Sequence, residues 1–308
     1  MSMMNQTEIE KLMQQNPHLN QYHAEITKQI GTPSFYEKIP RELKNEKYPN
    51  IIYPTKGVVF IHIYRSRNME EKEYHAIEPT LSKSLTEKKN LILNRLYERA
   101  YRISNITDSD ALRKAIGEVI DQITIVTNET GNKIKTTMKK IPVSASEKMS
   151  IRYDITKEIV GGGPLEPFMR DPYIEDIHIL SGENVHLIHK VFEMVKTNIY
   201  IDNEWASTFS QEFSEKIGSP VSDGQPIADG TLPDGSRVNI IHPREVSIKG
   251  PSMTIRKFSE TPISVTQLIN WGTINAEIAA YLWLALQYGR SFFVCGETAS
   301  GKTTTTNA

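Results

Sequence analysis

The fold is decided by the stretch Ser291-Phe-Phe-Val-Cys-Gly-Glu-Thr-Ala-Ser-Gly-Lys-Thr-Thr-Thr-Thr306. Its centre is a complete G-x-x-x-x-G-K-[ST] pattern, from Gly296 to Thr303. Glycines at both ends of the loop allow a tight turn whose backbone N–H groups point inward at phosphate oxygens. We expect Lys302 to reach the β- and γ-phosphates and the Thr303 hydroxyl to ligate Mg²⁺. The stretch therefore predicts a phosphate-binding loop.

The surrounding sequence agrees with this interpretation. The apolar run Phe292–Cys295 predicts a buried parallel strand that leads straight into the loop. Four threonines follow the lysine, and such a β-branched run is a poor helix start unless its hydroxyls are used. ATP and Mg²⁺ are the predicted cofactors, with Lys302 catalytic and Thr303 as the metal ligand. The predicted nucleotide contacts are Gly296, Glu297, Thr298, Ala299, Ser300, Gly301, Lys302, Thr303 and Thr304.

The sequence ends at Ala308, within about two helical turns of Lys302. A P-loop ATPase needs later strands with acidic residues for Mg²⁺ and water, and none follows the loop here. We expect this sequence to be the front part of a longer protein and to be inactive by itself.

Composition narrows the class of protein. The 308 residues carry 36 basic and 37 acidic side chains and 38% hydrophobic residues, which suits a globular protein and does not favour a nucleic-acid partner. The single cysteine, Cys295, excludes an internal disulfide, so a reducing cytoplasm is expected. No apolar run is long enough to cross a bilayer and no signal peptide is evident. At a membrane, the protein would be recruited to the inner face by a partner, without inserting.

The chain before the loop divides into three regions. Residues 1–45 are polar and predict a flexible leader, with a helical hint at Ile9, Leu12 and Met13 and a break at Asn16–Pro17. Residues 46–145 predict a mixed α+β region with strands near 51–53 and 58–64, then helices, and a flexible hairpin or linker at 127–142. Residues 146–260 begin with a helix that stops at Gly161-Gly-Gly163-Pro164, followed by short alternating strands. Histidines 178, 186 and 189 lie on these strands without the compact spacing of a metal site.

Two arginines precede the last region. Pro233-Asp-Gly235 predicts the turn of a hairpin, Arg237 leaves that turn, and Arg256 lies in the following strand. On neighbouring strands they could neutralise phosphate charge, or both could be exposed arginines without a special role. Residues 261–308 then predict two helices, the strand and the loop.

Four stretches resemble the type II/type IV secretion ATPases, and within them the archaeal branch that drives pilus or archaellum assembly. These are Gly163–Pro172 with Ile174–Ile177, Leu232–Arg237, Thr254–Phe258 and Gly296–Thr303. Ala299 stands where many members have glycine. The family's acidic Asp box, Walker B strand and His box would all lie downstream of residue 308.

The resemblance implies an α/β fold in which a PAS-like α/β N-terminal domain follows the N-terminal α+β region. Only the first helices, the strand and the P-loop of a RecA-like domain would then be present. It also implies a hexameric ring, nucleotide held between the two domains, Arg237 and Arg256 as phosphate-binding catalytic arginines, and a membrane platform protein as partner. An alternative is a partner-docking module with an inert fragment of the ATPase domain. The sequence does not distinguish pilus extension, retraction, secretion or rotation.

Overall fold

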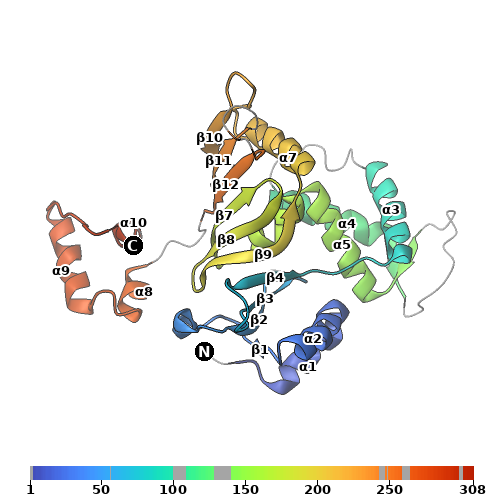
Figure 1. The fold of residues 1–308 in the computed structure, drawn as a ribbon, viewed down its shortest axis with the longest axis horizontal. Coiled ribbons are helices and arrows are strands. Elements are labelled where there is room, and N and C mark those ends of the chain that lie inside the picture. Colours follow the sequence, from blue (N-terminus) through green and yellow to red (C-terminus); the bar gives the residue numbers. More distant parts are fainter. Residues whose placement is uncertain are drawn as a thin grey trace. The chain divides into compact units, whose positions relative to one another are not determined.

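The computed structural model describes residues 3–55, 57–99, 109–127, 140–242, 247, 249–258, 264–297 and 301–308. The chain divides into two compact units, Met1–Lys257 and Phe258–Ala308, each described here by itself. Its fold is mixed α/β with a large, mostly antiparallel sheet (Figure 1), so the predicted α/β class is confirmed at that level. The PAS-like and RecA-like assignments and the domain boundaries stay predictions.

The first unit is built on one sheet, whose described strands follow the order β1-β2-β3-β4-β9-β8-β7-β12-β11-β10 (Figure 1). Pairing is parallel for β1 with β2 and for β4 with β9, and antiparallel at the other junctions. The bounds are β1 Ser34–Phe35, β2 Asn50–Pro54, β3 Phe60–Tyr64, β4 Glu73–Ile77, β7 Ile174–Leu180, β8 Glu183–His189, β9 Glu193–Ile201, β10 Ile227–Thr231, β11 Arg237–Ile241 and β12 Ser252–Arg256.

Alternation along these strands separates a core face from a polar face. On β7 and β12, for example, Ile177 and Ile255 are buried, whereas Asp176 and Thr254 point to the other side. Helix α7 (Asn203–Lys216) adds Ala206, Phe209 and Phe213 to the same core. The hairpin predicted around Pro233–Gly235 is present as β10 and β11.

A helical layer with its own core lies between β4 and β7 in the chain. It consists of α3 (Lys83–Tyr97), α4 (Ser109–Ile123) and α5 (Ala145–Ile159), with a two-stranded sheet of β5 (Thr124–Val126) and β6 (Ile141–Val143). The strands β5 and β6 pair in parallel, so these ends do not form the antiparallel hairpin expected at 127–142. Residues 128–139 of that prediction lie outside the described residues.

The N-terminal region differs from a flexible leader. It forms α1 (Gln6–Gln15), α2 (Pro17–Gln29) and the short 3-10 helix η1 (Arg41–Asn45). Leu19 is fully buried and packs in a cluster with Phe35, Ile52 and Phe60. A few apolar side chains at helical spacing suffice for this packing, although the average composition is polar.

The segment after α5 connects the helical layer to the sheet. It comprises the 3-10 turn η3 (Gly163–Leu165) and α6 (Glu166–Arg170). The buried Glu166 carboxylate accepts hydrogen bonds from Arg113 at 2.6 Å and from Arg170 at 2.5 Å. Burial alone would raise the pKa of Glu166, but these two arginines lower it. The buried carboxylate is therefore fully paired, with Arg113 reaching it from α4.

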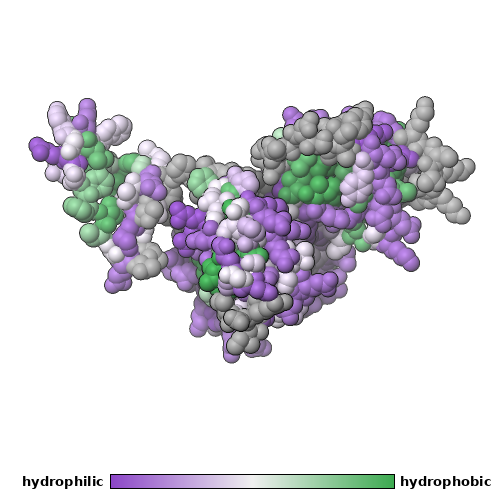
Figure 2. Space-filling model, turned by 90° about the horizontal axis from the view of Figure 1, so that it is seen from above, coloured by the Kyte–Doolittle hydropathy of each residue, from purple (hydrophilic) through white to green (hydrophobic). Residues whose placement is uncertain are grey.

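The second unit contains α8 (Val265–Asn270), α9 (Ala276–Gln287) and α10 (Lys302–Thr306). The prediction of a buried strand over Phe292–Cys295 is wrong, because these residues have no strand assignment and Phe293 is 91% exposed. A strand needs a hydrogen-bonding neighbour, and no strand of the described residues pairs with this run. Large side chains of α9 are also exposed, among them Tyr281, Trp283, Leu284 and Leu286. Figure 2 shows apolar surface on this unit, at the left of the view.

Candidate functional site

The phosphate-loop segment turns into a helix at Gly301. This glycine has φ of +87°, a conformation that other residues rarely adopt, and the place of a Cβ is open space. Backbone conformation, not crowding, therefore favours glycine here. Helix α10 starts at the next residue, and the Thr305 N–H donates to the Gly301 carbonyl oxygen at 2.9 Å.

Lys302 folds back over the start of the loop. Its Nζ donates to the carbonyl oxygens of Gly296 at 2.8 Å and of Glu297 at 2.6 Å. An anion entering the loop would compete with these two carbonyls for the ammonium group. The predicted contacts Thr298, Ala299 and Ser300 lie outside the described residues, as does the side chain of Thr303, whereas Thr304 is half-buried.

Arg237 and Arg256 are brought together by the sheet. They are direct cross-strand partners on β11 and β12, so their side chains start from adjacent points on the polar face. The next residue of the row is Asp176 on β7, whose two carboxylate oxygens accept from Arg256 at 2.9 and 3.2 Å. Hydrogen bonding to this carboxylate raises the pKa of the Arg256 guanidinium.

Asp176 pairs with one of the two arginines, Arg256. Asp176 is 15% exposed and Arg256 72% exposed, and within the described residues the Arg237 side chain has no carboxylate partner. At this pair two guanidinium groups lie beside one carboxylate, an arrangement that suits an anion with several oxygens. Asp176 was not predicted, although strand alternation from the apolar Ile177 and the polar His178 would have placed it on the face of the arginines.

The three strand histidines do not form one group. His178 and His186 are cross-strand partners on the polar face. His189 is buried, and its Nδ1 accepts the N–H groups of Val191 and Phe192 at 3.1 and 3.2 Å. Throughout the described residues, no cluster of three His, Cys, Asp or Glu side chains could hold a metal ion.

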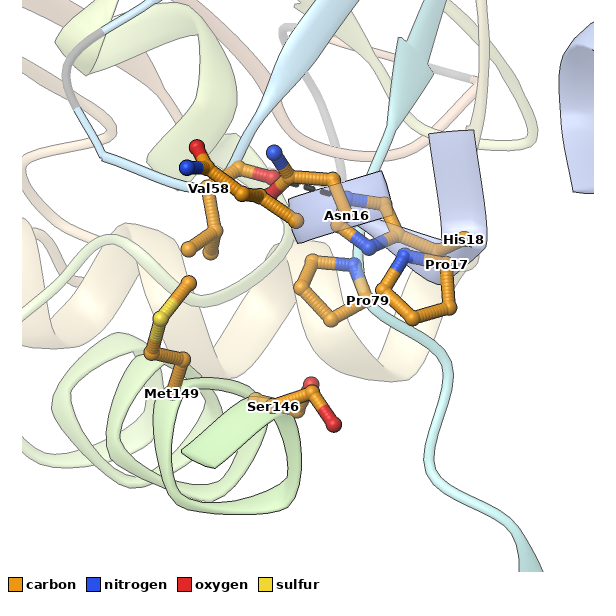
Figure 3. A pocket seen from close by; sticks show the side chains of 9 residues that line it. Asn16, Pro17, His18, Val58, Pro79, Ser146 and Met149 are labelled. Carbon is orange, nitrogen blue, oxygen red and sulfur yellow. Dashed lines mark hydrogen bonds between the residues drawn. The ribbon is translucent and has the colours of Figure 1, made fainter. Parts of the chain in front are cut away.

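A small hollow lies elsewhere in the first unit. Asn16, Pro17 and His18 line it from the α1–α2 corner, opposite Ser146 and Met149 of α5 (Figure 3). His18 is held by a hydrogen bond of 2.8 Å between its Nε2 and the Val58 carbonyl oxygen. The space in the hollow that the centre of a water-sized sphere can occupy is about 10 Å³. This is room for roughly one water molecule, so a nucleotide does not fit here.

The residues present fit a nucleotide phosphate in part. A glycine with positive φ before a helix, a lysine beside it and a pair of sheet arginines are suitable phosphate ligands. The loop and the arginines belong to different units, so a shared site is a proposal. No helix in the described ranges is both long and apolar enough to cross a membrane.

Comparison with known proteins gives relatives from Methanocaldococcus jannaschii. The protein named "Uncharacterized protein MJ0900" is 44% identical over 314 residues, which cover 99% of this chain and 57% of the relative. "Uncharacterized protein MJ0781" is 35% identical over 152 residues, 47% of this chain and 21% of the relative. The chain thus spans less than two thirds of either relative. No family model matches the chain.

Two solved structures are similar to part of the chain. One is the VirB11 ATPase of the Brucella suis type IV secretion system in complex with sulphate, with TM-score 0.32 and 25% identity, covering 46% of this chain and 49% of that one. The other is the Legionella pneumophila ATPase DotB, with TM-score 0.29 and 19% identity, covering 47% and 39%. Both of these proteins are ATPases, and at these TM-scores the likeness carries no argument for this chain.

Proposed function

We propose that the chain is the front part of an ATP-binding and ATP-hydrolysing motor of the type II/type IV secretion ATPase kind. The observation that carries this proposal is the complete phosphate-loop pattern, in which Gly301 has positive φ and Lys302 begins a helix. The three other stretches that resemble the same family support it. The activity of the whole motor is part of the proposal, because the relatives are longer than this chain.

The residues have distinct roles in this proposal. Lys302 exchanges the carbonyls of Gly296 and Glu297 for phosphate oxygens, and the Thr303 hydroxyl holds Mg²⁺. Mg²⁺ supplies charge neutralisation when it is bound. Arg237 and Arg256 neutralise charge that develops on the phosphates during transfer to water. Their cross-strand pairing supports this role because it gathers two fixed cations on one face.

The assembly is proposed from the resemblance. The subunit forms a hexameric ring in the cytoplasm, and a platform protein of a pilus, archaellum or secretion apparatus recruits it to the inner face of the membrane. Nucleic acid is not a proposed partner, because the 36 basic and 37 acidic side chains balance.

Titration calorimetry of this chain with MgATP tests nucleotide binding. We expect binding to weaken at least tenfold in Lys302→Ala and to stay unchanged in Arg290→Ala, which removes an exposed cation of the same unit. Equal affinity of both variants would remove the loop from the proposal. No binding by a folded wild-type chain would favour the partner-docking alternative.

A further inference from the structure

The end of β12 is held by Lys257, the last residue of the first unit. Its N–H donates to the Glu175 carbonyl oxygen at 2.8 Å and so extends the β12–β7 ladder by one residue beyond Arg256. Its Nζ donates to the carbonyl oxygens of Phe168 at 2.9 Å and Asp171 at 2.5 Å. A lysine ammonium on carbonyls at a helix C-terminus is a favourable arrangement, and these two belong to the end of α6.

The Phe168–Asp171 segment, to which Lys257 donates its hydrogen bonds, is itself anchored in the core. The Asp171 side chain is fully buried, and its Oδ2 accepts the hydroxyls of Tyr53 at 2.6 Å and Tyr74 at 2.9 Å. Its Oδ1 accepts the Tyr173 N–H at 2.8 Å. Tyr53 lies on β2 and Tyr74 on β4, so one carboxylate ties the N-terminal strands to the end of α6. Burial raises the pKa of Asp171, whereas its donors and the charge of Lys257 act in the opposite direction.

The hydrogen bonds of Lys257 restrain the position of Arg256, which directly precedes it in the chain. The contact of Arg256 with Asp176 is an exposed ion pair, and such pairs contribute little to holding a strand end. The two hydrogen bonds of Lys257 reach partly buried carbonyls and start from a charged donor, so they are the stronger restraint. Without them, the last ladder position would fray at the point where the chain leaves the sheet.

We propose that Lys257 is a positioning residue that clamps the end of β12 to the Phe168–Asp171 segment and so fixes Arg256 for phosphate binding. The part about Arg256 rests on the proposed ATPase function, whereas the clamp itself does not. Lys257 touches no phosphate in this arrangement.

Hydrogen exchange of the whole chain tests the clamp without any activity. Lys257→Met keeps the length of the side chain and removes its charge. We expect the amides of a peptide covering Ser252–Phe258 to exchange at least tenfold faster, while a peptide covering Ile227–Thr231 is unchanged. Lys249→Met is the control, because Lys249 is 74% exposed and its ion pair within the described residues is with the surface residue Glu183. Equal exchange of Ser252–Phe258 in both variants would overturn the clamp.

Steady-state ATP hydrolysis by the complete gene product tests the positioning role. Lys257→Met is expected to lower kcat about tenfold with KM for ATP nearly unchanged, because a misplaced cation costs transition-state stabilisation more than ground-state binding. The double variant with Arg256→Ala should be no slower than Arg256→Ala alone. Full additivity of the two losses would overturn the positioning role. Wild-type protein without turnover would contradict the proposed function, whereas the exchange result would still decide the clamp.

Discussion

Arg237 and Arg256 face each other directly across β11 and β12, and among the described residues the carboxylate of Asp176 pairs with Arg256 and not with Arg237. Two like charges at directly opposite strand positions oppose the pairing of those strands. A fold selected for stability alone has no reason to keep such a pair, whereas an anion bound between the two guanidinium groups would relieve the repulsion. This relationship gives the arginine hypothesis a consequence for stability as well as for activity.

Replacing Arg237 with glutamine is expected to stabilise the first unit slightly. The change removes the repulsion, so the free energy of unfolding should rise by up to about 0.5 kcal/mol at low salt. The gain should disappear in 1 M salt, where charges are screened over about 3 Å. Urea unfolding at the two salt concentrations checks this. Loss of stability at low salt would contradict the repulsion.

The Asp171 network predicts a loss for Tyr74→Phe. The variant leaves the buried carboxylate without one of its two hydroxyl donors, and we expect the free energy of unfolding to fall by about 1–3 kcal/mol. Tyr200→Phe is the matched control, because Tyr200 is 60% exposed. Urea unfolding compares the two variants, and equal stability would show that the Tyr74 hydroxyl contributes nothing to the network.

Glu166 is expected to be a critical buried charge. Glu166→Ala leaves Arg113 and Arg170 without their shared carboxylate and should destabilise the first unit by about 3–5 kcal/mol. Glu158→Ala, in which the lost side chain is 56% exposed, should change stability by less than about 1 kcal/mol. Thermal and urea unfolding measure both, and a small effect at Glu166 would mean that the buried pairs are not net stabilising.

Acid is expected to weaken the first unit through two buried histidines. Burial lowers the pKa of His62 to about 3 and of His189 to about 3. His62 is neutral in a closed pair of hydrogen bonds, since its Nδ1 accepts from the Tyr22 hydroxyl and its Nε2–H donates to Asn50, both at 2.8 Å. Between pH 6.5 and 3 the unfolded chain binds protons that the folded chain does not, so stability falls as pH falls.

His62→Gln tests this pH dependence. The variant should reduce the slope of unfolding free energy against pH by up to about 1.4 kcal/mol per pH unit within that window. His178→Gln, which changes a half-exposed histidine of the polar face, is the control. An unchanged slope in His62→Gln would contradict the buried neutral state.

The sequence predicted individual strands and helices better than the pairing and packing between them. Strands β7, β8 and β9 were predicted because their apolar residues alternate, and α5 because its apolar spacing and the following glycines mark a helix and its stop. The strand at Phe292–Cys295 was predicted from consecutive apolar residues, yet a strand forms only beside a hydrogen-bonding neighbour. The helical spacing of Ile9, Leu12 and Met13 and the break at Asn16–Pro17 match α1 and its end. Helix α2 was missed because the packing of Leu19 depends on strands distant in the sequence.

The candidate site was predictable only in part. The phosphate-loop residues follow from a local pattern, and strand alternation places both arginines on the polar face. The turn at Pro233–Gly235 sets the pairing of β10 with β11, so it does not predict that Arg237 and Arg256 pair directly across β11 and β12. The contacts of Lys257 and Asp171 could not be predicted, because they join segments far apart in the sequence, from 86 residues for Lys257 with Asp171 to 118 residues for Asp171 with Tyr53.

The most direct test is Mg²⁺-dependent ATP hydrolysis by the complete gene product, measured for the wild type, Lys302→Ala, Arg237→Ala and Arg256→Ala. The account predicts turnover in the wild type and none in Lys302→Ala. Each arginine variant should lose at least tenfold in kcat while ATP binding largely survives. Arginine variants with wild-type turnover would show that both are plain sheet residues. A wild-type protein that neither binds nor hydrolyses ATP would contradict the account as a whole.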